Sequence, residues 1–89
     1  MSERDRIETA LHDFVAQELL DGDASELTPS TNLLALGIID SLSMVSLRVF
    51  MERSFNVRVP DGIQPEDFST LAAMATMVER LQREAAQSP

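Results

Sequence analysis

The chain has 89 residues and a formal net charge of −8, which is enough length for one small domain and the wrong sign of charge for a nucleic-acid partner. Its only aromatic side chains are four Phe residues, so aliphatic and Met side chains must form the core, and this composition favours a helical bundle over a β-sandwich. The absence of Cys excludes disulfide bonds and a thiolate nucleophile from the chain itself, and no apolar run approaches the length of a membrane span.

The first predicted helix covers about residues 3–20. Ser2 can cap it, and acidic residues in its first turn suit the positive end of the helix dipole. His12, the only histidine, falls off the apolar stripe, which indicates a solvated surface residue rather than a catalytic base. The stripe expected to face the core is Ile7, Leu11, Phe14 and Val15.

A long connection follows, from Asp21 to Asp40, and loops of this length in a compact domain are often functional. Asp21 and Asp23 have the spacing of a calcium loop, but the other EF-hand ligands are missing, so we expect no metal site. Gly37 indicates a positive φ or a close approach. Apolar residues throughout the loop should tether it across the bundle and hold its end in a defined place: Leu27, Leu33, Leu34, Leu36, Ile38 and Ile39.

The second helix is predicted over residues 41–54, because no Gly or Pro interrupts the segment, and either Asp40 or Ser41 can be its N-cap. One apolar stripe suits the core: Met44, Leu47, Met51 and Phe55. A second stripe lies almost opposite and starts beside Ser41: Leu42, Val45 and Val49. Spacing alone leaves two interpretations of the second stripe equally open, a docking surface or a part of the core covered by the long loop.

Residues 56–59 alternate like a strand, but a lone strand has no partner here. We therefore expect an extended connector with Val57 and Val59 in the core, followed by a turn over residues 60–62.

A proline followed by two acids predicts a short helix over residues 65–68. Ser69 or Thr70 can then cap a last helix over about residues 71–86, and residues 87–89 should fray. Its core-facing stripe keeps nearly 3.6-residue spacing: Leu71, Met74, Val78, Leu81 and Ala85. The predicted fold is all-α, a four-helix bundle of three main helices and one short helix, with a long loop between the first and second helices.

The segment Gly37-Ile38-Ile39-Asp40-Ser41-Leu42, which leads into an apolar helix, resembles the attachment motif of the acyl and peptidyl carrier proteins. The likeness covers most of the chain, because residues 31–33 and 65–71 also fit. In that family the serine of Asp-Ser-Leu is esterified with 4′-phosphopantetheine from coenzyme A, and the thiol of this arm carries acyl or aminoacyl groups. The resemblance thus implies attachment at Ser41, recognition by the modifying transferase aided by Asp40, and a role of Leu42 in anchoring partners or shaping the exit of the arm.

The resemblance further implies a single non-catalytic carrier domain over residues 1–89. We expect a free-standing cytoplasmic monomer that serves specialised metabolism or biosynthesis of the nonribosomal-peptide or polyketide type. Its expected partners are a phosphopantetheinyl transferase, an adenylating acyl or aminoacyl ligase, and condensing or tailoring enzymes, with neither nucleic acid nor membrane among them.

The second helix departs from the acid-rich helix of the carriers of fatty-acid synthesis. Its polar residues are Ser43, Ser46, Arg48, Glu52 and Arg53. This composition shifts the expected docking from acidic side chains to the apolar stripe of Leu42, Val45 and Val49.

Two other functions compete with the carrier. A cofactor-free adaptor could dock partners through the stripe of Leu42, Val45 and Val49, with Ser41 as a plain N-cap. A serine hydrolase is rejected, because two isoleucines separate Gly37 from Asp40 in the Gly-Asp-Ser-Leu pattern and no residue orients His12 as a base.

Overall fold

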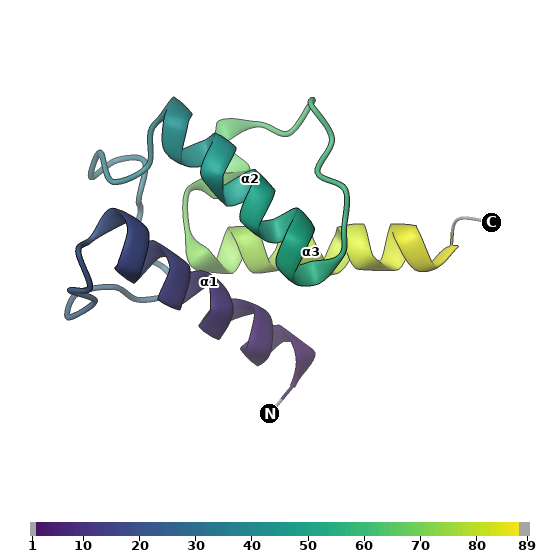
Figure 1. Cartoon of the computed structure of the whole chain (residues 1–89), viewed down its shortest axis with the longest axis horizontal. Coiled ribbons are helices and arrows are strands. Elements are labelled where there is room, and N and C mark those ends of the chain that lie inside the picture. The colour runs from purple at the N-terminus through teal and green to yellow at the C-terminus, as the bar shows by residue number, and fades with distance from the viewer. Residues whose placement is uncertain (1, 88–89) are drawn as a thin grey trace.

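The computed structural model describes residues 2–87 and is all-helical over that range (Figure 1). Its elements are α1 (Glu3–Leu19), α2 (Ser41–Phe55), the short 3₁₀ helix η1 (Pro65–Phe68) and α3 (Leu71–Gln87). The all-α prediction with its long first loop is confirmed, and each main helix ends within one residue of its expected bound. Fraying was predicted wrongly for Gln87, which belongs to α3, whereas residues 88–89 lie outside the described residues.

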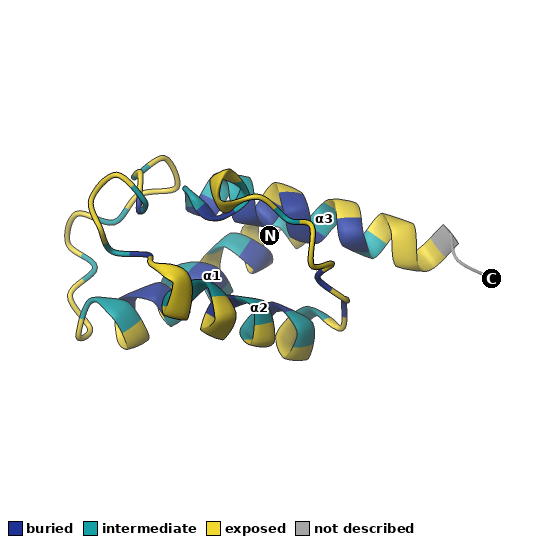
Figure 2. Ribbon diagram, turned by 90° about the horizontal axis from the view of Figure 1, so that it is seen from above, coloured by how far each residue is buried: buried dark blue, intermediate teal, exposed yellow. Residues whose placement is uncertain are grey.

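The core lies where the inner faces of the three main helices meet (Figure 2). α1 packs along α3, and α2 crosses in front of α3 in Figure 1. The fully buried residues include the predicted stripe positions Ile7, Leu11, Val15, Leu47, Met51, Leu71, Met74 and Val78. The predicted stripe of α3 is wrong at its end, because α3 extends past the core after Leu81 and leaves Ala85 exposed.

The long loop is anchored mainly through Leu33, whose side chain is fully buried. Its backbone N–H donates a hydrogen bond to the carbonyl of Ser69 (2.7 Å), and its carbonyl accepts from the N–H groups of Ile38 (2.9 Å) and Ile39 (3.2 Å). These bonds connect the end of the loop to the segment that precedes α3. Gly37 has φ +72°, as its position indicated.

The predicted tethering of the loop is confirmed for five of its six apolar residues and wrong for Leu36. Leu33 and Ile39 are buried, and three others are partly buried against the core: Leu27, Leu34 and Ile38. Leu36 is 65% exposed. The loop therefore presents one large apolar side chain to solvent, just before α2 begins.

The connector after α2 runs back along that helix, and Val57 and Val59 are buried as predicted. The Val59 N–H donates to the Glu52 carboxylate (2.9 Å), and the Arg48 guanidinium pairs with Asp61 (2.6 Å). Both contacts hold the connector against one side of α2.

Candidate functional site

Ser41 is the first residue of α2, and its side chain is exposed. Asp40 is the N-cap, and its carboxylate accepts a hydrogen bond from the Ser43 backbone N–H (2.9 Å). The sequence allowed either Asp40 or Ser41 as the N-cap of this helix, and the structure shows that it is Asp40. Because capping does not occupy the Ser41 hydroxyl, and no other group in residues 2–87 bonds to it, this hydroxyl is free to react.

Ser41 also lies at the N-terminal end of α2, which is the end of a helix that stabilises a negative charge. Free N–H groups and the positive end of the helix dipole stabilise a phosphate at this place by about 0.3–1 kcal/mol. The Asp40 carboxylate opposes this effect, so its contribution is to hold the first turn rather than to bind an anion. Exposure, a free hydroxyl and a helix start together fit a phosphodiester on Ser41.

The hydrogen bonds that Ser43 donates, chiefly from its backbone N–H, hold the pKa of Asp40 below its ordinary value of 3.8. A carboxyl group with a lowered folded-state pKa stabilises the fold above its unfolded-state pKa, and this contribution is lost as the pH falls through the folded-state value. The cap is therefore at full strength at neutral pH and is lost in acid.

We expect Asp40→Ala to lower the melting temperature at pH 7, because the Ser43 N–H loses its acceptor. The difference in melting temperature between this variant and the unmodified protein should become smaller as the pH falls below 3.8, since both proteins then lack the charged cap. Thermal unfolding at a series of pH values between 7 and 2 measures this difference. Asp40→Asn is the matched control, because it keeps an acceptor oxygen without a titrating charge; a difference that stays constant with pH would contradict the charged cap.

The large hydrophobic residues that stay exposed within residues 2–87 are few, and they gather on α2 and in the segment before it. Leu42 is 80% exposed, Val45 60% and Val49 43%. The loop does not cover this stripe, so the interpretation of these residues as core is wrong. Leu36 was missed as a surface residue, because an irregular loop has no periodicity from which exposure can be predicted. We call Leu36, Leu42, Val45 and Val49 the apolar strip.

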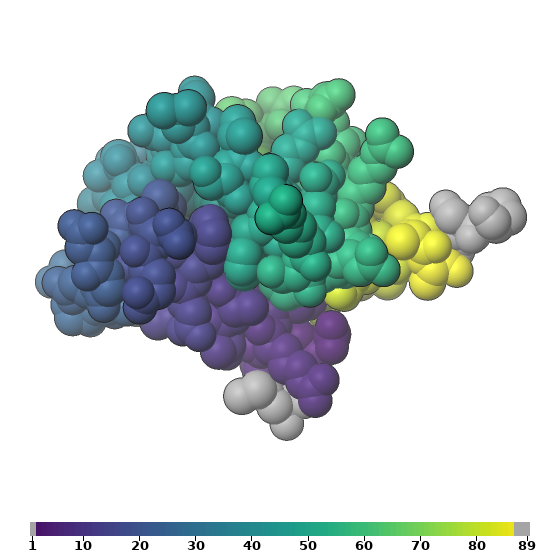
Figure 3. Space-filling view, in the orientation of Figure 1, coloured from purple at the N-terminus to yellow at the C-terminus, as the bar shows by residue number. Residues whose placement is uncertain are grey.

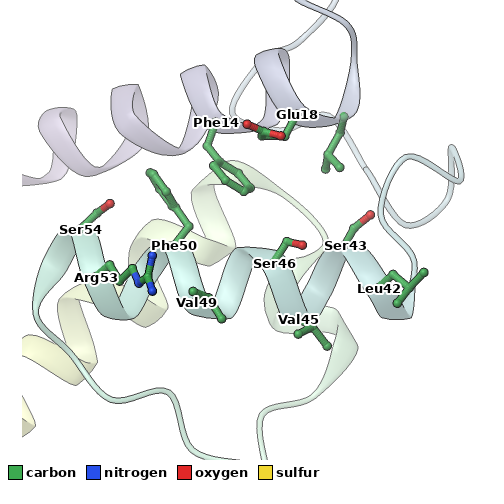
Figure 4. Close-up of a pocket in the computed structure, with 11 residues that line it drawn as sticks. Phe14, Glu18, Leu42, Ser43, Val45, Ser46, Val49, Phe50, Arg53 and Ser54 are labelled. Atoms are coloured by element: carbon green, nitrogen blue, oxygen red, sulfur yellow. The ribbon is translucent and has the colours of Figure 1, made fainter.

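A groove of about 640 Å³, open to solvent along one side, separates α2 from the end of α1 (Figure 4). Phe14 and Phe50 stack in it with ring centroids 4.4 Å apart. The side formed by α2 starts at Leu42, directly after Ser41, and continues to Arg53 and Ser54. In the space-filling view, α2 lies beside α1 on the face toward the reader (Figure 3).

Within residues 2–87, the structure places no His beside Ser41 that could activate its hydroxyl. His12 lies on α1, where its ring contacts the neighbouring Asp13 (3.3 Å). Residues 2–87 contain no group of three His, Asp or Glu side chains that could hold a metal ion. None of the helices in this range is both long enough and apolar enough to span a bilayer. The chemistry available at the site is that of one exposed hydroxyl.

Comparison with known families and proteins gives a consistent result. The family model described as "Phosphopantetheine attachment site" matches residues 10–78. The probable acyl carrier protein PigG of Serratia sp. is 32% identical over 76 residues, which are 84% of this chain and 87% of PigG. The lincomycin biosynthesis protein LmbN of Streptomyces lincolnensis is 36% identical over 63 residues, 71% of this chain but 23% of LmbN.

A solved structure shares the fold. One chain in a structure described as "Crystal structure of FAD-dependent dehydrogenase" superimposes with a TM-score of 0.69 and 40% sequence identity. The superposition covers 76% of this chain and 97% of that chain.

Proposed function

This chain belongs to the phosphopantetheine-attachment family of carrier proteins, and on that premise we propose that Ser41 is the residue that carries the arm. Family membership makes the protein a non-catalytic carrier with covalent 4′-phosphopantetheine as its cofactor. The observation that carries the assignment of the residue is the free, exposed hydroxyl at the start of α2, inside the matched segment. When bound, the arm supplies the thiol that a chain without Cys lacks.

Two residues of the chain support this role of Ser41. Asp40 holds the first turn of α2, so that Ser41 points outward from a fixed helix start. Leu33 fixes the end of the long loop through its buried side chain and its bonds to neighbouring backbone groups. The proposal also keeps a single domain over residues 1–89, and its support is the one core that joins all three main helices between Ile7 and Leu81.

The cargo in this proposal is an acyl or aminoacyl group held as a thioester during biosynthesis of a specialised metabolite. The names of two relatives, a probable acyl carrier protein and a lincomycin biosynthesis protein, support a biosynthetic setting. Loading by an adenylating ligase and visits to condensing or tailoring enzymes follow from such a role. The similar chain in a crystal described as an FAD-dependent dehydrogenase supports a flavin dehydrogenase as one class of tailoring partner.

Partners are proposed to dock on the apolar strip next to Ser41. The strip holds the large hydrophobic residues that the described part of the chain leaves exposed, and such surfaces mark interaction sites. Acidic side chains contribute little here, because Glu52 accepts a hydrogen bond from the connector and Arg48 and Arg53 carry positive charge. Docking is therefore driven by apolar burial.

Leu42→Ala is expected to lower the kcat/KM of a phosphopantetheinyl transferase for this protein by about tenfold, or about 1.4 kcal/mol, because Leu42 is the most exposed residue of the strip and adjoins Ser41. The melting temperature should change little, since the side chain is 80% exposed. Initial rates of loading measure the effect. Gln17→Ala, an exposed change on α1, is the control; equal rates for both variants would argue against docking at Leu42.

The experiment that tests the proposed function is intact mass after incubation with coenzyme A and a broad-specificity phosphopantetheinyl transferase. We expect a gain of one phosphopantetheine, mapped to the peptide that contains Ser41. No gain by a folded protein would overturn the proposal and favour an adaptor that uses the apolar strip without a cofactor.

A further inference from the structure

The groove between α1 and α2 begins beside Ser41 and follows α2 for most of its length (Figure 4). From Ser41 to Arg53 the helix rises about 18 Å. An extended phosphopantetheine arm measures roughly 15 Å from phosphorus to sulfur, if its bonds advance as in an extended peptide. An arm that starts at Ser41 and follows this groove would thus place its thiol near the level of Phe50, which lies about 13 Å along the helix.

The groove offers the two kinds of surface that such an arm needs. The arm alternates apolar methyl and methylene groups with a hydroxyl and two amides. Val49, Phe14 and Phe50 provide apolar surface, and Ser43 and Ser46 provide hydroxyl groups close to the start of the groove. Because these serines are small, they leave room between the helices that a larger side chain would fill.

The other side of α2 is a poorer place for the arm. The hollow there, lined by Met44, Ile63 and Phe68 among others, holds only about 150 Å³. The connector forms one of its walls and is held against α2 by the ion pair of Arg48 and Asp61 (2.6 Å). This hollow therefore offers an arm less than a quarter of the volume of the α1–α2 groove.

We propose that the groove between α1 and α2 is the resting site of the arm; the proposal depends on attachment at Ser41. Leu42, Val45 and Val49 line the groove and also belong to the apolar strip, so the resting arm covers part of the docking surface. A partner that binds this strip competes with the arm for the same side chains. Docking and release of the arm are thereby coupled.

The test is NMR of isotope-labelled protein before and after loading, once mass spectrometry has shown one phosphopantetheine. We expect shift changes that continue from Ser41 along the groove to Phe50 and Arg53, with nuclear Overhauser contacts between the methyl groups of the arm and the rings of Phe14 and Phe50. Changes confined to residues 40–43, or changes around Ile63 and Phe68, would overturn the resting site.

Two variants fill the groove from opposite walls. Ser46→Phe occupies it from α2 and Glu18→Phe from α1, and both positions are exposed, so the fold should tolerate either change. Each should abolish the contacts between the arm and the rings. Ala85→Phe, a small-to-large change at an exposed position of α3, should keep them. Contacts that survive in both groove variants contradict the proposal; a wild-type protein that gains no mass contradicts both the resting site and attachment at Ser41.

Discussion

Ser41→Ala is expected to abolish uptake of phosphopantetheine completely, because the change removes the one atom through which the phosphodiester can form at this position. The fold should be retained, since Asp40, not Ser41, caps α2 and the Ser41 side chain is exposed. Intact mass of the variant after prolonged incubation with coenzyme A and transferase measures the loss. A circular dichroism spectrum and melting curve close to those of the unmodified protein would show that the reaction is lost because the hydroxyl is absent and not because the protein is unfolded.

Ser46→Ala is the matched control for this result. Ser46 is an exposed serine on the same helix, so its loss removes a comparable hydroxyl without touching the helix start. This variant should take up one phosphopantetheine, as the unmodified protein does. A mass gain in Ser41→Ala would mean that another hydroxyl is modified, and peptide mapping would then identify it.

The second large effect is expected at Leu33, where replacement by Ala should lower the free energy of unfolding by about 2–5 kcal/mol, the usual range for a buried Leu. The side chain is fully buried although it belongs to an irregular loop. Because the same residue bonds through its backbone to Ser69, Ile38 and Ile39, a cavity here also loosens the segment that leads to Ser41. Urea denaturation followed by circular dichroism measures the change in stability.

Leu36→Ala is the matched control for Leu33→Ala, because it makes the same substitution three residues away in the same loop but at an exposed side chain. Leu36 is 65% exposed, so we expect its loss to change the free energy of unfolding by less than about 0.5 kcal/mol. If Leu36→Ala were as destabilising as Leu33→Ala, the placement of the loop would be wrong.

The slower loading by the transferase that is expected for Leu42→Ala should also be found, to a smaller extent, for Leu36→Ala, because Leu36 belongs to the same apolar strip.

Much of the fold was predictable because a helix can be recognised from the spacing and type of residues in its own segment. The 3.6-residue spacing of Ile7, Leu11 and Val15 identified the buried face of α1 without knowledge of its neighbours. Pro65 and the acids that follow it marked the short helix η1 at the bounds that the structure has. At the end of α3 the same periodicity misled, since Ala85 continues the stripe beyond the point where the other helices can cover it.

The candidate site divides in the same way. The sequence by itself determined the chemistry: a chain without Cys, with one Gly-Ile-Ile-Asp-Ser-Leu segment before a helix, resembles carriers that obtain their thiol from an attached arm, and the match of the family model to residues 10–78 agrees. Local sequence also limited the N-cap of α2 to Asp40 or Ser41, because both side chains can accept a hydrogen bond from the first turn.

Only the tertiary structure decided which residues are free. It gave the cap to Asp40 and left the Ser41 hydroxyl unbonded, buried Leu33 while exposing Leu36, and left the stripe of Leu42, Val45 and Val49 uncovered. The physical reason is that exposure depends on what packs against a residue from elsewhere in the chain. Periodicity reports which side chains share a face of a helix, but only the positions of the loop and of the other helices decide whether that face meets the core or the solvent.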